Sequence, residues 1–139
     1  ADVPAALAFE SRADIRGSVL CIEDNLANFE LVQQFIRLRP GITLFHARDG
    51  ADARMLAPVC QPDLVLLDLR LPDIHGLDLL RELRALPALA RVPCIALSAN
   101  ALETEIEEAR RAGIADYLTK PLDVSAFLRS VDSVLVRAR

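Results

Sequence analysis

Five short apolar runs, separated by stretches of helical periodicity, constrain the fold of this chain more than any other feature of its sequence. Each run has the length of a buried strand and stops at a polar or turn-forming residue. Between the runs, apolar residues recur every three or four positions, which is typical of a helix packed on one side. The predicted strands are 19–22, 42–46, 64–67, 93–97 and 115–118, and the predicted helices are 26–38, 50–57, 75–86, 101–112 and a last one from 124.

Strands and helices that alternate in this way are joined by right-handed crossovers, and the strands pair in parallel. Helices then cover both faces of the sheet, so its strands are continuous apolar runs, as 64–67 is. The sequence therefore predicts an α/β fold, a doubly wound sheet of five parallel strands with five helices. Breaks in the pattern contain proline: 39–41 ends the first helix, and 58–62 is expected to end the second.

Composition limits the classes of protein to which the chain can belong. Its 139 residues suit one domain, and we expect a linker over 1–17 and the domain over 18–139. The 16 basic and 20 acidic residues give a net charge of −4, which argues against a nucleic-acid-binding surface. No apolar run approaches the roughly 18 residues of a membrane span. Cys21, Cys60 and Cys94 have no spacing typical of disulfide frameworks or zinc sites, which indicates a reducing cytoplasm.

Polar residues follow four of the five predicted strands. Glu23 and Asp24 follow the first, Asp68 the third, Ser98 the fourth, and Lys120 lies just beyond the fifth. In an open parallel sheet, ligands bind beyond the carboxyl ends of the strands. If these four strands lie side by side, their polar residues converge on one edge of the sheet.

The residue types at this edge favour phosphoryl transfer. Three carboxylates within a few ångströms repel one another unless a cation offsets their charge. Mg²⁺ takes oxygen ligands and keeps several waters, so it fits two carboxylates with open positions. Lys120 adds a mobile positive charge and Ser98 a neutral hydrogen-bond donor, which suit the negative charge on phosphoryl oxygens. Asp68 is then the candidate nucleophile, which would form an aspartyl phosphate.

Four segments, each at the end of its own predicted strand, carry a resemblance to a known family. They are 19–25 (VLCIEDN), 64–73 (LVLLDLRLPD), 96–99 (ALSA) and 116–121 (DYLTKP). On these segments the chain resembles the receiver domain of response regulators in two-component signalling. The resemblance implies the flavodoxin-like strand order 2-1-3-4-5. It also implies a binding module that catalyses only its own phosphorylation and dephosphorylation, rather than an enzyme acting on a diffusible substrate.

The resemblance implies a metal site and a phosphoacceptor. Asp68 would accept a phosphoryl group from phosphohistidine on a histidine kinase or a histidine phosphotransfer domain. Asp24 would bind Mg²⁺ directly, together with Asp68 and the backbone carbonyl of Arg70, and Glu23 would bind it through a water. All of these positions carry the residue type that the family pattern requires.

The resemblance also implies a switch next to the phosphoryl group. Ser98 and Lys120 would hold the phosphoryl oxygens. Tyr117 would turn inward as Ser98 moves toward the phosphate, and the small Ala99 leaves room for this movement. The Lys120–Pro121 peptide bond is expected to be cis. The surface of the last strand and the last two helices would then carry partner contacts, including those of a homodimer.

Each of these residues also has a purely structural interpretation. Asp24 can cap the helix that follows it, and Tyr117 can be a half-buried packing residue. His46 and His75 have no second histidine or cysteine at metal-ligand spacing, so we expect both at the surface. The apolar stripe of helix 26–38 belongs to the core, while its exposed side offers a docking site for a phosphotransfer helix.

Two functions compete with that of a phosphoaccepting receiver domain. Such a domain also occurs in two settings. A Mg²⁺-dependent phosphatase of the haloacid-dehalogenase type also uses an aspartate nucleophile, but it carries a second acid where this chain has Arg70. A receiver-like scaffold that is never phosphorylated usually lacks an acid or the lysine, and this chain lacks none. The segment 22–28 resembles receivers of hybrid sensor histidine kinases, and the chain starts with Ala1 and ends with its last helix. We therefore expect a receiver domain excised from such a kinase, and the parent kinase is compatible with membrane attachment. The alternative is a stand-alone single-domain regulator.

Overall fold

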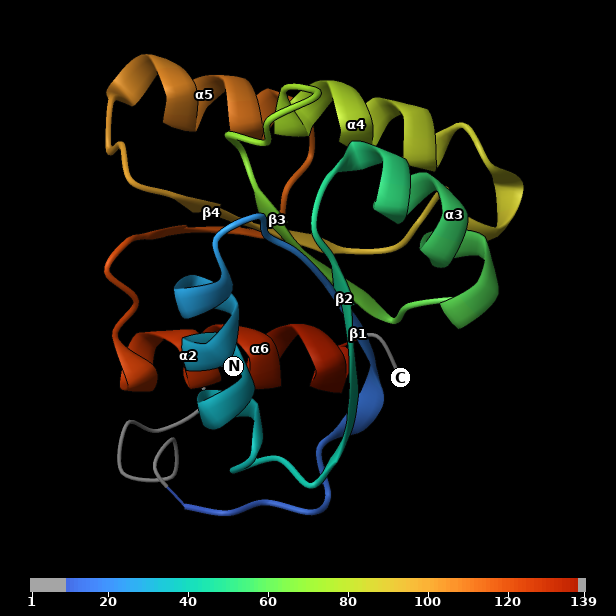
Figure 1. The fold of residues 1–139 in the computed structure, drawn as a ribbon. Coiled ribbons are helices and arrows are strands. Elements are labelled where there is room, and N and C mark those ends of the chain that lie inside the picture. Colours follow the sequence, from blue (N-terminus) through green and yellow to red (C-terminus); the bar gives the residue numbers. More distant parts are fainter. Residues whose placement is uncertain (1–9, 138–139) are drawn as a thin grey trace.

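The computed structural model describes residues 10–137, within which five strands alternate with five α-helices and one short 3₁₀ helix (Figure 1). The strands are β1 (Arg16–Ile22), β2 (Gly41–Ala47), β3 (Leu64–Asp68), β4 (Cys94–Ser98) and β5 (Asp116–Thr119). The helices are α2 (Leu26–Ile36), α3 (Gly50–Cys60), α4 (Gly76–Arg84), α5 (Glu103–Arg111) and α6 (Val124–Arg137), with the 3₁₀ helix η1 (Pro87–Leu89) after α4. Within residues 10–137, no helix combines the length and the hydropathy that a bilayer span requires.

The five strands form one parallel sheet in the order β2-β1-β3-β4-β5, which confirms the predicted fold and strand order. β1 lies between β2 and β3, so its Cys21 is opposite both His46 and Leu66. Asp68 at the end of β3 is opposite Leu97 of β4. The carboxyl ends of β1, β3, β4 and β5 are therefore neighbours, which is the condition that the predicted site required.

Successive residues of each strand face opposite sides of the sheet, so the continuous apolar runs supply two cores. In the first core, Val19 and Cys21 of β1 pack with Phe29 and Val32 of α2 and with Phe127 of α6. Figure 1 shows α2 and α6 together on this side of the sheet, and α3, α4 and α5 on the other. The sheet is thus covered on both faces, as predicted.

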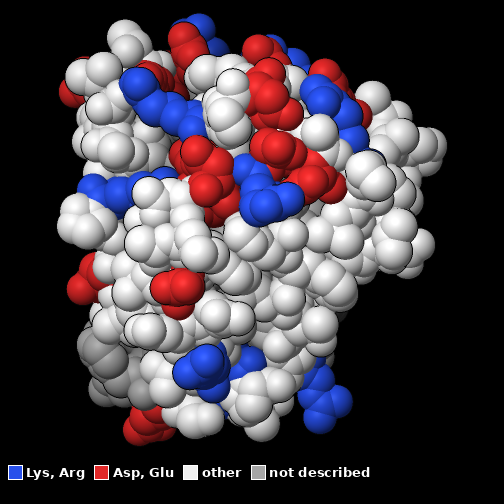
Figure 2. All heavy atoms as spheres, viewed as in Figure 1, with Lys and Arg blue, Asp and Glu red and all other residues white. Residues whose placement is uncertain are grey.

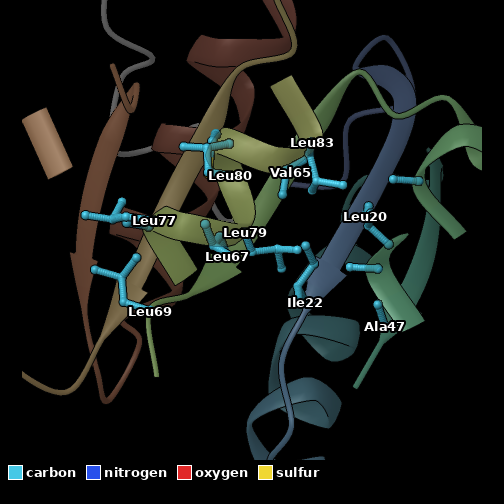
Figure 3. Packing of buried hydrophobic residues seen from close by; sticks show 14 of the residues in the cluster. Leu20, Ile22, Ala47, Val65, Leu67, Leu69, Leu77, Leu79, Leu80 and Leu83 are labelled. Atoms are coloured by element: carbon cyan, nitrogen blue, oxygen red, sulfur yellow. The ribbon is translucent and has the colours of Figure 1, made fainter. Parts of the chain in front are cut away.

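The second core fixes β3, the strand that ends in Asp68. Figure 3 shows Leu20 and Ile22 of β1 and Leu67 of β3 among the leucines of α4. Four leucines of α4 are at most 4% exposed, namely Leu77, Leu79, Leu80 and Leu83. Because β3 is buried on both faces, the position of its last residue is set by packing rather than by a loop.

The packed domain begins earlier in the chain than predicted. β1 starts at Arg16, and Ile15 before it is buried in the first core. The backbone N–H of Arg12 also donates to the carbonyl of Leu38, at 2.9 Å. Residues 10–17 of the expected linker are therefore in contact with the domain, and residues 1–9 lie outside the described part of the chain.

The second helix is longer than predicted. α3 runs through Pro58 to Cys60, so the prediction that Pro58 ends this helix was wrong. A proline in the last turn removes a single intrahelical hydrogen bond, which packing tolerates, and the helix ends instead where Gln61 adopts the left-handed conformation, with φ of 46°. The short helix η1 was not predicted either.

A buried ion pair connects the segment before β2 with α6. The Arg39 guanidinium donates two hydrogen bonds to the Asp132 carboxylate, both of 2.7 Å, and both side chains are fully buried. Arg39 also donates to the backbone carbonyls of Glu10 and Leu38, at 2.6 and 2.8 Å. The pair therefore holds the amino-terminal segment, the connection between α2 and β2, and α6 together at the first core.

We expect Asp132→Ala to lower the free energy of unfolding by about 3–5 kcal/mol, because it leaves the Arg39 guanidinium buried without its carboxylate. Urea unfolding followed by circular dichroism measures the change. The matched control is Arg81→Ala, which breaks the exposed Arg81–Asp78 pair and should change stability by less than about 1 kcal/mol. Equally small effects of the two substitutions would contradict the role given to the buried pair.

Candidate functional site

Three carboxylates lie together where β1 and β3 end, and we name Glu23, Asp24 and Asp68 the acid cluster. Asp68 is the last residue of β3, and Glu23 and Asp24 directly follow β1, the neighbouring strand. One oxygen of each residue lies within 4.8 Å of the oxygens of the other two. Glu23 and Asp68 are 1% and 5% exposed, whereas Asp24 is open to solvent. The acid cluster is therefore accessible from its Asp24 side.

The ammonium of Lys120 enters the acid cluster from the end of β5. Its Nζ lies 2.6 Å from Oε1 of Glu23 and 3.5 Å from Oδ2 of Asp68. When all three acids are ionised, one ammonium leaves two negative charges uncompensated. Lys120 is the only lysine in the chain, and a compact ammonium acts here as a point charge that contacts both carboxylates. A bound dication would neutralise the remaining charge.

The environment of Asp68 disfavours its charged form. Burial raises the pKa of the Asp68 carboxyl above its ordinary value, and the neighbouring Glu23 raises it further. Two groups lower the pKa instead: the backbone N–H of Arg70, which donates to Oδ1 at 3.0 Å, and the Lys120 ammonium. A cation bound beside Asp68 would favour the carboxylate in the same way.

The segment after β4 links the other predicted site residues. The backbone N–H of Lys120 donates to the Ser98 carbonyl at 2.8 Å. The Ser98 hydroxyl oxygen accepts a hydrogen bond of 3.1 Å from the Asn100 N–H, and the Tyr117 hydroxyl donates to the Asn100 carbonyl at 2.7 Å. Asn100 thus joins the hydroxyl at the end of β4 to the aromatic side chain of β5. The Lys120–Pro121 peptide bond is cis, as expected.

Arg70 connects the acid cluster with α5. Its backbone N–H donates to Asp68, while its guanidinium lies 3.2 Å from the Glu105 carboxylate on α5. The pair spans 35 positions of sequence, and no local pattern predicts it.

Figure 2 shows that charged side chains gather over the upper part of this face of the molecule, where α4 and α5 lie, and that the lower part is mostly uncharged.

The acid cluster fits a small, hard cation. All three of its donors are carboxylate oxygens, the ligands that Mg²⁺ prefers. Mg²⁺ binds its ligands at about 2.0–2.1 Å, so oxygens on opposite sides of one ion are about 4.2 Å apart. Adjacent oxygens on such an ion are about 3 Å apart, so oxygens that lie within 4.8 Å of one another would draw closer when they share it. Asp24 and Asp68 are the residues that would hold it, and the exposed Asp24 leaves room for waters.

Comparison with known proteins identifies the family. The sequence profile of the response regulator receiver domain matches residues 19–132. The chain belongs to this family. Among relatives of this receiver domain, the polar-differentiation response regulator DivK of Brucella anthropi is 34% identical over 118 residues, which are 85% of this chain and 95% of DivK. Because the chain belongs to the receiver family, the alternative of a phosphatase of the haloacid-dehalogenase type is not supported.

Solved structures of receiver domains have the same fold. The receiver domain of the sensor histidine kinase PA1611 from Pseudomonas aeruginosa PAO1 was crystallised with a magnesium ion coordinated in its active-site cleft. It is 34% identical, with a TM-score of 0.78 over 87% of this chain and 98% of that one. The phosphorylated cyanobacterial phytochrome response regulator RcpA is 29% identical, with a TM-score of 0.70 over 86% of this chain and 91% of RcpA.

The predicted site residues lie at one edge of the sheet, and two further residues join them. The predicted residues are Glu23, Asp24, Asp68, Arg70, Ser98 and Lys120, while Tyr117 lies beside them and contacts Asn100. Asn100 was not predicted. His46 was expected at the surface, yet it is half-buried and contacts the backbone of Glu23. A lone histidine in a strand belongs to no motif, so the amino-acid sequence did not indicate this contact.

We expect Asp68→Asn to raise the Tm of the metal-free protein at neutral pH, because it removes a buried carboxylate whose charge the acid cluster disfavours. Millimolar Mg²⁺ should raise the Tm of the unsubstituted protein, since a ligand that binds the folded state stabilises it, and should raise that of Asp68→Asn much less. Differential scanning fluorimetry measures both shifts. Glu108→Gln, which neutralises an exposed carboxylate of α5, is the control and should change neither. A lower metal-free Tm, or an undiminished Mg²⁺ shift, in Asp68→Asn would contradict this assignment.

Proposed function

We propose that this receiver domain accepts a phosphoryl group on Asp68 from phosphohistidine of a histidine kinase or a histidine phosphotransfer domain. Mg²⁺ is the metal, and phosphorylation switches a partner-binding surface. The observation that carries the proposal is the acid cluster with the Lys120 ammonium inserted between two of its carboxylates. A scaffold that is never phosphorylated has no need for such a costly concentration of buried charge.

In the proposed reaction, a carboxylate oxygen of Asp68 attacks the phosphorus, and the phosphorus–nitrogen bond of phosphohistidine breaks. The imidazole leaves, and Asp68 becomes an aspartyl phosphate. Asp24, Asp68 and the Arg70 carbonyl would hold Mg²⁺, with Glu23 through a water, and the bound ion would supply positive charge beside the phosphoryl oxygens. Asp68 ends a strand that is buried on both faces, so packing holds its backbone in place for this step.

Lys120 and Ser98 are the residues that would bind the other phosphoryl oxygens. The Lys120 ammonium lies 3.5 Å from Asp68, so it is within reach of a group attached to that carboxylate. The Ser98 hydroxyl accepts a hydrogen bond from Asn100, which leaves its own proton free to donate to a phosphoryl oxygen. Both residues therefore offer donors where negative charge accumulates.

The hydrogen bonds around Asn100 support Ser98 and Tyr117 as the switch. If the Ser98 hydroxyl moves toward the phosphoryl group and keeps its bond with the Asn100 N–H, Asn100 moves with it. The Asn100 carbonyl then no longer holds the Tyr117 hydroxyl in its present place. The change would reach β5 and the helices on either side of it in the chain, α5 and α6, which form the surface proposed for partner binding or for a homodimer.

The outer face of α2 is the proposed docking surface for the phosphohistidine donor. Glu30 is the only charged residue of α2, and Leu26 at its start, close to the acid cluster, is 63% exposed. Figure 2 shows that the part of the surface around α2 is mostly uncharged. Such a face suits the apolar side of a helix from a phosphotransfer partner.

Two settings fit this chemistry. The match to the receiver domain of the sensor histidine kinase PA1611 supports the proposal that this chain is the receiver of a hybrid kinase. The alignment over 95% of the response regulator DivK supports the alternative, a stand-alone regulator. The flanking sequence of the gene decides between them, because a hybrid kinase carries an ATP-binding kinase region upstream of its receiver.

Incubation of the protein with Mg²⁺ and a small phosphodonor is expected to add one phosphoryl group, measured as the mass of the intact protein. Asp68→Asn should abolish the mass increase, because the amide is a poor nucleophile. Asp73→Asn is the matched control: this carboxylate of the loop after β3 accepts hydrogen bonds from Gly50 and Ala51, outside the acid cluster, and its variant should label normally. Full labelling of Asp68→Asn, or no labelling of the unsubstituted protein, would overturn the proposed function.

Lys120→Met is expected to separate metal binding from phosphorylation. Loss of the ammonium leaves the acid cluster more negative, so the Kd for Mg²⁺ should stay the same or fall. The rate of phosphorylation should fall by at least about tenfold, because a donor to the phosphoryl oxygens is lost. Calorimetric titration and the labelling rate measure the two effects, with the exposed Arg129→Met as a control for loss of a cation. Weaker Mg²⁺ binding with an unchanged labelling rate would contradict the role of Lys120.

A further inference from the structure

We propose that His46 is a positioning residue that holds the backbone of Glu23 and Asp24 ready for the metal. This inference rests on the proposed Mg²⁺ site and names a residue that supports it from outside the acid cluster. The Nε2 of His46 lies 2.8 Å from the Glu23 carbonyl oxygen, and its ring is stacked on Phe29 with centroids 3.7 Å apart and planes 6° from parallel.

The contact with Glu23 requires a proton on Nε2 of the histidine ring. A carbonyl oxygen only accepts hydrogen bonds, so Nε2 must carry the proton and donate it. An Nε2–H donor is therefore the form that the structure selects. An apolar side chain of similar size could fill the same space but could not make this bond.

The side chain of His46 extends the pairing of β1 with β2 by one residue, to Glu23. β1 ends at Ile22, and the Glu23 N–H still donates to the carbonyl of Ala47, at 3.0 Å. The Glu23 carbonyl, on the other side of the residue, is held by the His46 ring. Both backbone groups of Glu23 are thus fixed by β2, although Glu23 lies beyond the strand.

The stack on Phe29 fixes the far end of the same turn. Phe29 is a buried residue of the first turn of α2, so the ring of His46 contacts the chain both before and after the turn that carries Asp24. A turn that is held at both ends loses less conformational freedom when its acids bind a metal. Groups that hydrogen-bond to metal ligands typically change metal affinity by about 10- to 100-fold. His46 acts one step further out, on the backbone of the turn that carries Asp24, so we expect an effect at the lower end of this range.

The test compares two substitutions in the full chain by calorimetric titration with MgCl₂. His46→Phe keeps an aromatic ring against Phe29 and removes the donor, and we expect its Kd for Mg²⁺ to rise about tenfold. His46→Gln keeps a side-chain N–H donor and loses only the stack on Phe29, so we expect a smaller loss, with a Kd within about threefold of the unsubstituted value. A Kd for His46→Phe within twofold of the unsubstituted protein, or equal losses in the two variants, would overturn the proposal.

A second measurement needs no variant. Because coupling between two sites is reciprocal, a contact that strengthens Mg²⁺ binding must itself be strengthened by Mg²⁺. In nitrogen-15 NMR spectra we expect His46 in the Nε2–H form, with exchange of that proton slowed at least about threefold by Mg²⁺. An Nδ1–H form, or exchange unaffected by a metal that binds, would overturn the inference alone. Absence of Mg²⁺ binding to the unsubstituted protein would instead overturn the proposed function, and this inference with it.

Discussion

Repulsion among Glu23, Asp24 and Asp68 is the constraint on which the rest of the structure depends. Carboxylate oxygens within 4.8 Å of one another, two of them on buried residues, repel one another, so packing elsewhere in the fold must hold them together. The sheet order supplies the restraint, because β1 and β3 are neighbours and end at the same edge. The Lys120 ammonium, which arrives from a third strand, offsets part of the repulsion. What remains is a negative charge that favours a dication, and this unsatisfied charge is the basis of the proposed function.

The apolar cores and the buried ion pair keep this charge fixed. Each core binds one face of β1 and β3, so neither strand can shift along its neighbour without losing contacts on both sides. Arg39 and Asp132 close the first core between the segment before β2 and α6. The site is therefore built at the ends of rigid strands, while Ser98 and Tyr117, the residues proposed to change on phosphorylation, are linked through the more exposed segment after β4.

Local patterns predicted the five strands and the polar residues that follow them, because these features are periodic or directly follow a strand. The strand order and the expected roles of Arg70 and Tyr117 came from the resemblance to receiver domains. The five apolar runs are the five strands of the sheet, and Asp68 directly ends one of them. Contacts between polar residues distant in sequence were not predictable in this way. Arg39 meets Asp132 across 93 positions and Arg70 meets Glu105 across 35, and neither pair follows a motif. The contact of His46 with Glu23 was missed for the same reason, since it depends on a backbone carbonyl that packing brings to the ring.

The central claim is that Asp68 is the phosphoacceptor, and the most direct test is to locate the phosphoryl group by a chemical reaction. Borohydride reduces an acyl phosphate to an alcohol, so an aspartyl phosphate becomes homoserine, which peptide mass spectrometry locates. After phosphorylation in the presence of Mg²⁺, reduction is expected to convert position 68 to homoserine, and omission of Mg²⁺ should prevent the conversion. Homoserine at another aspartate, or a phosphate that survives on a hydroxyl or imidazole, would contradict the account of Asp68 as the phosphoacceptor.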